Sequence, residues 1–232
     1  MKRVLLKLSG EALARESGEL YDHKFVDEVA TTVAGLVDEG YQIAIVTGAG
    51  NIWRGRQGGE MNRISADRMG MLATVINAIY IKDAIERAGK KAAVMTAVSM
   101  EPFAEIYSPE GAVKHLESGE VVVFGAGLGI PYLSTDTTGA VRAAEIGVDA
   151  ILMAKNIDYI YTDDPRKNPD AKKLETVKAT DVLAMNLKAI DATATAFSLS
   201  AGIPVKVFGL TDASDIAKAV KGEKSGTVIT AE

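Results

Sequence analysis

The 232-residue sequence contains no cysteine and only two histidines, His23 and His115. Without cysteine the chain cannot form disulfides, use a thiolate nucleophile or bind zinc through sulfur. Two histidines are too few for a histidine-rich metal centre, and we expect both to be surface or helix-cap residues. We therefore predict no metal site built from protein ligands.

Long hydrophobic runs are also missing. No apolar stretch approaches the roughly 18 residues that a membrane-spanning helix requires. The segment MKRVLLKLSGEALARE has only a short apolar run, interrupted by Lys7, and no small-residue cleavage site. This is not the pattern of a signal peptide, so we expect a cytoplasmic protein with no membrane partner.

The sequence has no excess of basic residues. It carries 26 Lys and Arg against 31 Asp and Glu, for a formal net charge of -5. Nucleic-acid binding depends on basic side chains that neutralise phosphates, so we expect no nucleic-acid partner. A local basic cavity can still bind a small anion. The composition is that of a globular protein, and without repeats or linkers it predicts a single domain over residues 1–232.

Strand-like and helix-like segments alternate along the chain. Buried strands are predicted at 4–8, 42–47, 92–97, 121–124, 150–153 and 205–208. Helices are predicted at 24–39, 63–88 (as one or two helices), 136–146, 191–201 and 213–220. Strands that read as continuous apolar runs indicate an α/β fold with a mostly parallel sheet covered on both faces. In such sheets ligands bind beyond the carboxyl ends of the strands.

Two of these strand ends carry small residues and a cation. Lys7 precedes a Ser-Gly turn, where its charge and the backbone N–H groups can bind phosphate, although a solvated lysine beside an ordinary turn is the alternative. The second strand leads into GAGNIWRG at 48–55, in which Arg54 suits phosphate oxygens. Trp53 replaces the third glycine of a dinucleotide-binding turn, but Asp67 lies at a passable distance, so an NAD-binding alternative stays open.

Two further segments suggest ligand contacts. GAGLGIPYLSTD at 125–136 combines glycines with a Ser/Thr/Asp helix start, which is either a phosphate site or a helix cap made by Ser134 or Thr135. In the segment 155–165, Tyr161 could stack on a base and the acids could bind a ribose, or the segment could be a solvated hairpin. Asp191 is predicted to be a helix N-cap. The P-loop motif and the protein-kinase motifs are absent.

Taken in order, several motifs resemble the amino-acid kinase family and, within it, the bacterial UMP kinase branch. They are KLSGEAL at 7–13, GAGNIWRG at 48–55, DRMGMLAT at 67–74, GIPYLSTD at 129–136 and GEKSGT at 222–227. The resemblance covers nearly the whole chain. It implies a three-layer α/β/α sandwich, transfer of the ATP γ-phosphoryl group to UMP with Mg²⁺, a homohexamer, and GTP or UTP as effector.

The resemblance also implies roles for individual positions. From the chemistry of phosphoryl transfer we predict Lys7, Arg54 and Asp136 as the catalytic residues. The ATP contacts would be Lys7, Leu8, Ser9, Gly10, Gly50, Arg54, Lys155, Asn156, Tyr161 and Asp164. The UMP contacts would be Ala49, Asp67, Leu128, Gly129, Ile130, Pro131, Tyr132, Leu133, Ser134 and Thr135. The regulatory loop would comprise Arg15, Glu16, Ser17, Gly18, Glu19 and Leu20.

A nucleotide phosphate acceptor is already ionised near neutral pH, because its second pKa is about 6, so no general base is expected. Lys7 and Arg54 would neutralise the transferred group, and Asp136 would hold Lys7 or bind magnesium through water. Two alternatives remain from the sequence. One is a kinase of the same fold with a carboxylate or carbamate acceptor, and the other is a non-catalytic nucleotide sensor.

Overall fold

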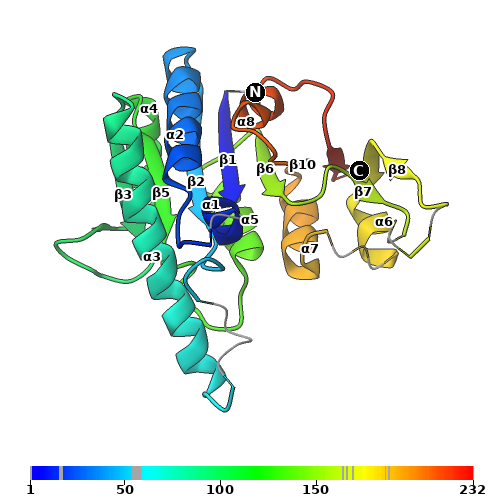
Figure 1. Cartoon of the computed structure of the whole chain (residues 1–232), viewed down its shortest axis with the longest axis horizontal. Coiled ribbons are helices and arrows are strands. Elements are labelled where there is room, and N and C mark those ends of the chain that lie inside the picture. The colour runs from blue at the N-terminus through cyan, green and yellow to red at the C-terminus, as the bar shows by residue number, and fades with distance from the viewer. Residues whose placement is uncertain are drawn as a thin grey trace.

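The computed structural model describes residues 2–15, 18–53, 59–163, 165, 167–168, 170–185, 187 and 189–231. These residues form an α/β/α sandwich, with a central sheet between two layers of helices (Figure 1). The sheet contains β1 (Arg3–Leu8), β2 (Gln42–Thr47), β3 (Ala92–Thr96), β4 (Glu105–Ile106), β5 (Val121–Gly125), β6 (Ala150–Lys155), β9 (Thr176–Lys178), β10 (Val205–Gly209) and β11 (Thr227–Thr230). A separate antiparallel pair joins β7 (Ile160–Tyr161) to β8 (Lys173–Leu174).

The described residues of the main sheet form nine strands in the order β4-β3-β5-β2-β1-β6-β10-β11-β9. The strands from β4 to β10 are parallel, and β11 runs antiparallel to β10. The carboxyl ends of β1, β2, β5 and β6 therefore lie at one edge of the sheet, which positions the loops that follow them side by side. The expectation of a mostly parallel sheet is confirmed.

The helices are α1 (Gly10–Ala14), α2 (His23–Asp38), α3 (Arg63–Arg87), α4 (Pro109–Glu117), α5 (Thr135–Glu145), α6 (Ala179–Ala184), α7 (Ala192–Ala201) and α8 (Ser214–Val220). One hydrophobic cluster joins α2, α3 and α8 to one face of the sheet, and a second cluster joins α4, α5, α6 and α7 to the other face.

Strand β1 shows how the sequence assigns side chains to these faces. Successive side chains of a strand point to opposite sides. Val4 and Leu6 accordingly belong to the cluster beneath α2 and α3, whereas Leu5 belongs to the cluster beneath α5. Lys7 has the parity of Leu5 and faces α5. In β6, Lys155 likewise follows Ile151 and Met153 onto the α5 side.

Helix α3 is one continuous helix, although Gly70 lies inside it. Asn62 caps it by accepting a hydrogen bond from the Ile64 N–H at 2.9 Å. Figure 1 shows that its N-terminal half projects beyond the carboxyl edge of the sheet. The early part of α3 can therefore contact loops at that edge rather than the sheet itself.

The sequence analysis missed the short elements α1, α4, α6 and β11. Short helices show too few turns for a hydrophobic period to be recognised, and α4 is signalled only by its Ser108 cap before Pro109. The hairpin alternative for the segment 155–165 is partly realised, because Ile160 and Tyr161 pair with β8. None of the described helices is long and apolar enough to cross a membrane.

Candidate active site

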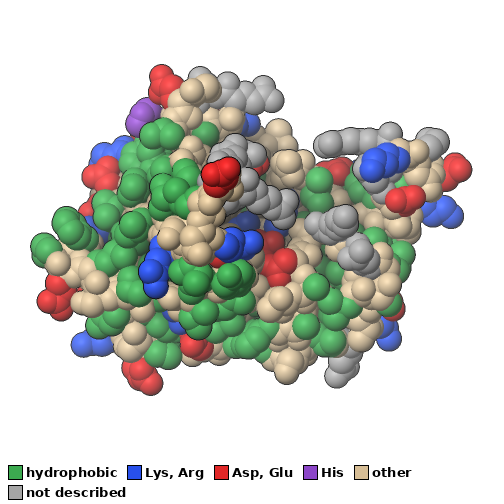
Figure 2. Space-filling model, turned by 90° about the horizontal axis from the view of Figure 1, so that it is seen from below, with side chains coloured by type: hydrophobic (Ala, Val, Ile, Leu, Met, Phe, Trp, Pro, Cys, Tyr) green, Lys and Arg blue, Asp and Glu red, His purple; other side chains and the backbone are tan. Residues whose placement is uncertain are grey.

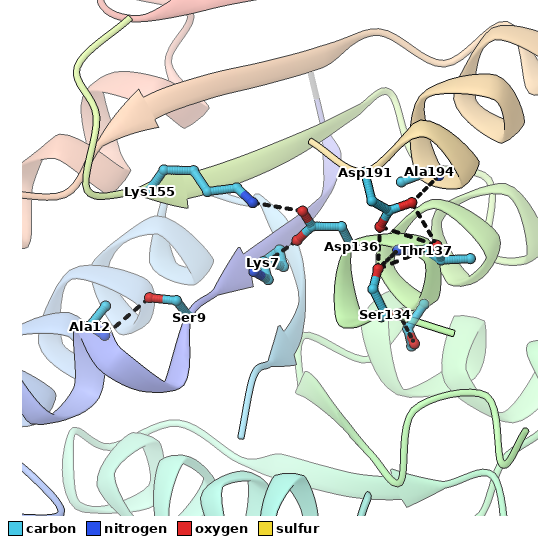
Figure 3. A network of polar contacts seen from close by, with 10 residues as sticks. Lys7, Ser9, Ala12, Ser134, Asp136, Thr137, Lys155, Asp191 and Ala194 are labelled. Carbon is cyan, nitrogen blue, oxygen red and sulfur yellow. Dashed lines mark hydrogen bonds and ion pairs between the residues drawn. The ribbon is translucent and has the colours of Figure 1, made fainter. Parts of the chain in front are cut away.

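Two lysines from neighbouring strands converge on one carboxylate at the carboxyl edge of the sheet. Lys7 Nζ lies 2.8 Å from Asp136 Oδ1, and Lys155 Nζ lies 2.6 Å from Asp136 Oδ2 (Figure 3). Asp136 is in the first turn of α5, where the helix dipole favours a negative charge. Lys7 and Asp136 are only 6% and 8% exposed. The expected contact between Lys7 and Asp136 is present, and Lys155 joins it as a second cation.

The electrostatics of this triad keep Asp136 ionised. Burial alone would raise the pKa of Asp136, but the ammonium groups of Lys7 and Lys155 outweigh it and lower that pKa below its ordinary value. Burial and the nearby Lys7 charge lower the pKa of Lys155, while Asp136 opposes this shift. Within the triad one negative charge faces two positive charges, which suits the site to an anion, and the nearby Asp191 carboxylate offsets part of the Lys155 charge.

The turn after β1 packs directly against the turn after β2. The Gly48 N–H donates to the Leu8 carbonyl oxygen at 2.9 Å. A methyl group at Gly10 would lie 2.5 Å from the Gly50 nitrogen, so only glycine allows this approach. Ser9 caps α1, because its Oγ accepts from the Ala12 N–H at 3.1 Å. Lys7 to Gly10 and Ala49 to Gly50 are thus brought together as expected.

A buried asparagine that the sequence analysis did not single out holds the second turn. Asn77 of α3 is fully buried, and its Nδ2 donates to the Gly48 carbonyl oxygen at 2.7 Å. Asn77 also exchanges hydrogen bonds with Asn51, and the Tyr21 hydroxyl donates to Asn77 Oδ1 at 2.8 Å. The sequence did contain a signal for Asn77, because it is a polar residue at a core position of the 63–88 helical pattern.

The loop after β5 is fixed to α3 at two points. The Ala126 N–H donates to Thr74 Oγ1 at 2.9 Å, and the Tyr132 N–H donates to Asp67 Oδ2 at 2.8 Å. Arg63 also donates to Asp67, at 2.8 and 2.9 Å. The structure therefore places Asp67 beside the loop that holds Leu128, Gly129, Ile130, Pro131, Tyr132, Leu133, Ser134 and Thr135. In that loop Ile130, Tyr132 and Leu133 are exposed.

The helix-cap interpretation of the Ser/Thr/Asp cluster holds for Ser134, whose Oγ accepts from the Thr137 N–H at 3.0 Å. Asp191 is an N-cap as predicted, because its carboxylate accepts from the Ala194 N–H at 2.8 Å. The same carboxylate also accepts from the Ser134 hydroxyl and from Thr137 Oγ1 (Figure 3). Asp191 thus ties the starts of α5 and α7 together beside the two lysines.

A large cavity opens next to the lysine pair. Its volume is about 1050 Å³, which is large enough for a nucleotide. Its lining includes Lys155, Asn156, Tyr161, Leu210 and other residues of the β6–β7 segment and the end of β10. Figure 2 looks onto this edge of the molecule and shows acidic and basic side chains gathered near the middle of the view.

Arg15 also lines this cavity, and its Nη2 donates to the Thr211 carbonyl oxygen at 2.8 Å. The predicted regulatory loop therefore begins at the cavity wall. Within the same loop, the Leu20 carbonyl oxygen accepts from Asn51 Nδ2 at 3.0 Å, which connects it to the second turn. Arg54, Asp164, Glu16 and Ser17, which the sequence analysis also selected, lie outside the described residues.

In the described part of the chain, no group of three or more His, Asp or Glu side chains could hold a metal ion. Asp136, the acid nearest to the lysines, has both oxygens engaged by ammonium groups. The residues present at this edge therefore fit anionic groups better than a bare cation.

Comparisons with known proteins agree with this geometry. The sequence profile of the amino acid kinase family matches residues 2–209. The chain belongs to the amino acid kinase family. Within this family, the chain is similar to the UMP kinase of Bacillus anthracis, with a TM-score of 0.95 and 35% identity over 100% of this chain and 96% of the other.

Two further solved structures are also similar. For the UMP kinase of Ureaplasma parvum the TM-score is 0.93 with 33% identity, covering 99% of this chain and 98% of the other. For the uridylate kinase of Archaeoglobus fulgidus the TM-score is 0.75 with 26% identity, covering 99% and 100%. The similarity thus extends over the whole amino acid kinase fold.

Proposed function

We propose that this protein is a UMP kinase, which transfers the γ-phosphoryl group of ATP to UMP and releases UDP and ADP. The observation that carries the proposal is the Lys7–Asp136–Lys155 triad, which lies where two glycine turns and the 125–135 loop meet. The similarity to two UMP kinases, at 35% and 33% identity over nearly the whole chain, supports UMP as the acceptor.

ATP is assigned to the side of the site that contains the 1050 Å³ cavity. Its phosphates would approach Lys7, Leu8, Ser9, Gly10 and Gly50, and its adenosine would contact Asn156 and Tyr161. Lys155, at the end of β6, shares Asp136 with Lys7 and also lines the cavity. The proposed phosphate site needs close backbone approach, which Gly10 and Gly50 provide.

UMP is assigned to the opposite side, against Ala49, Asp67 and the loop from Leu128 to Thr135. Asp67 fixes this loop through the Tyr132 N–H, so it would act on UMP both directly and by positioning the loop. Its carboxylate is held by Arg63 and Tyr132 rather than by solvent alone.

In the proposed reaction, a phosphate oxygen of UMP forms a bond to the γ-phosphorus while the bond from that phosphorus to the β–γ bridging oxygen breaks. Such transfers depend on alignment and on charge neutralisation rather than on covalent chemistry by the protein. Lys7 and Lys155 would neutralise the transferred group, and Asp136 would position both lysines. Magnesium bound to the ATP oxygens would supply further neutralisation. Arg54 is proposed as a third cation.

A homo-oligomer, with the hexamer as its proposed form, is supported by an exposed apolar surface on α3. Leu72 and Ile76 are 54% and 52% exposed, and Met69 and Ile79 continue this surface. Figure 2 shows hydrophobic side chains over a wide area of the face it displays. Regulation by GTP or UTP through residues 15–20, and a single domain over residues 1–232, are also proposed.

A coupled assay of ADP release tests this function. We expect rapid turnover with UMP and much slower turnover with CMP, glutamate, aspartate or carbamate. We also expect Lys7→Met to lower kcat by about 10² to 10³, by analogy with other preorganised charge stabilisers. Binding of both nucleotides without UDP formation would instead identify a nucleotide sensor, and preferred turnover of a carboxylate or of carbamate would identify a different kinase of this fold.

A further inference from the structure

A second cavity lies away from the lysine pair and plays no part in the proposed reaction. Its volume is about 340 Å³, and it is bordered by β6, β10, β11, the start of β9 and the segment 222–226 that follows α8. This size is at the lower end of the range for small-molecule sites. It suits a ligand much smaller than a nucleotide.

The wall of this cavity contains a buried lysine that forms no close ion pair among the described residues. Lys206 is 7% exposed, and its Nζ donates to the backbone carbonyl oxygen of Glu223 at 2.6 Å. Among the described residues, no carboxylate forms an ion pair with it. Because an ammonium group has three donors, two remain for another acceptor. Burying an ammonium group that lacks a close ion pair is costly, and burial accordingly lowers the pKa of Lys206, although the Glu223 charge opposes this shift.

The rest of the wall offers little to a polar ligand group. The Oγ of Ser225 is buried with almost no accessible surface, so a group inside the cavity does not reach it. The remaining wall is largely apolar and includes Ala150, Leu152 and Val228.

We propose that this cavity is a binding site for a small monocarboxylate with an apolar body. Its carboxylate would accept a hydrogen bond from Lys206 Nζ, and its hydrocarbon part would pack against Ala150, Leu152 and Val228. Glu175 and Glu223 also border the cavity, so a ligand with several negative charges is disfavoured. Lys224, which also lines the cavity, adds a second positive charge.

The site adjoins the nucleotide side of the molecule. Tyr159 lines both cavities. The next residue, Ile160, donates its N–H to Thr227 Oγ1 at 2.8 Å, and Thr227 follows Ser225 and Gly226 at the start of β11. The carboxylate site itself does not depend on the proposed kinase reaction, so each proposal can fail without the other.

Isothermal titration calorimetry with two matched probes tests the site. Sodium 4-methylpentanoate and 4-methylpentan-1-ol have the same hydrocarbon body but differ in the charged group. We expect saturable binding of the carboxylate and at least tenfold weaker binding of the alcohol. Equal affinities, or no saturable binding of the carboxylate, would overturn the proposal. In wild-type crystals soaked with 4-bromobutanoate, we expect the anomalous bromine signal within this cavity, and a signal only elsewhere would also overturn it.

A pair of lysine variants tests the assigned cation. Lys206→Met keeps the apolar stem but removes the charge, and we expect at least tenfold weaker binding of 4-methylpentanoate together with a higher melting temperature. Lys218→Met is the matched control, because Lys218 is an exposed residue of α8 that pairs with Asp215. Unchanged binding in Lys206→Met would refute the assignment. If the Lys206→Met variant does not fold, the relative affinities of the wild-type protein for 4-methylpentanoate and 4-methylpentan-1-ol still test the proposal.

Discussion

Asn77 and Asn51 exchange two hydrogen bonds, from Asn77 Nδ2 to Asn51 Oδ1 at 2.8 Å and from Asn51 Nδ2 to Asn77 Oδ1 at 3.1 Å. Asn77 lies on α3, whereas Asn51 lies in the turn after β2. Because Asn77 also donates to the Gly48 carbonyl oxygen, the helix fixes the turn that is proposed to meet both nucleotides. The amide pair therefore connects the core of the protein to the site.

We expect Asn77→Ala to destabilise the protein by about 1–3 kcal/mol, because it leaves the Gly48 carbonyl oxygen and the Asn51 amide without their buried partner. The urea midpoint measures this loss. We also expect lower kcat/KM for ATP and UMP, since the turn is no longer held. Glu86→Ala is the control, because Glu86 is an exposed residue of the same helix that pairs only with Lys82 among the described residues. Equal effects of the two variants would contradict the role of Asn77.

Asp136→Asn should both destabilise the protein and slow the reaction. The substitution leaves Lys7 and Lys155 facing each other without the shared carboxylate, and breaking a buried ion pair in this way costs about 3–5 kcal/mol. Denaturant unfolding and kcat are the two measurements. Asp83→Asn, which removes an exposed partner of Arg87, should change neither appreciably. A stable, fully active Asp136→Asn variant would show that the carboxylate positions neither lysine.

Asp67→Ala should raise KM for UMP by about tenfold and change KM for ATP little. Asp67 accepts a hydrogen bond from the Tyr132 N–H. Removing its carboxylate releases the loop assigned to UMP and also removes the proposed direct contact with UMP. A tenfold change corresponds to about 1.4 kcal/mol, the scale expected for a lost charge-assisted hydrogen bond. Initial-rate kinetics with each substrate varied separately provide the test, with Glu86→Ala on the same helix as control. A larger effect on ATP than on UMP would reverse the proposed placement.

His115 should make stability depend on pH. Burial lowers the pKa of His115, but its hydrogen bonds to Glu105 and Glu120, at 3.0 and 2.7 Å, outweigh this and raise the pKa above the ordinary 6.5. The stabilising contribution is therefore complete below pH 6.5 and is lost as pH rises through the folded-state pKa. We expect His115→Gln to lower the urea midpoint more at pH 5.5 than at pH 9. A difference independent of pH would disprove this contribution.

The sheet and the principal helices could be predicted from the sequence because their signals are local. The segments 42–47 and 63–88 are long enough to show a clear β-branched run and a clear helical period, and the structure matches them closely. Elements such as α1 and β11 are short, and their place is decided by contacts with distant residues. Local propensity cannot reveal such contacts.

The site was predictable in its residues more than in its geometry. Lys7, Asp136 and Lys155 were each selected, but their shared ion pairs depend on which face of β1 and β6 meets α5, and that requires the strand order. Asn77 was missed because a single amide within an apolar helical pattern does not show which backbone group it will bind. The pairing of β1 with β6, which are far apart in the sequence, is what places Lys7 and Lys155 side by side, and only the structure shows it.

Strand β11 has a consequence for biosynthesis. It lies between β10 and β9, and its Thr227 accepts from Ile160 and donates to the Leu174 carbonyl oxygen at 2.5 Å. The ribosome makes β11 after every other described strand and helix, although much of the nascent chain can begin to fold earlier. The β7–β8 hairpin therefore acquires this support only after β11 has been synthesised, so the wall of the proposed nucleotide cavity is completed after the rest of the sheet.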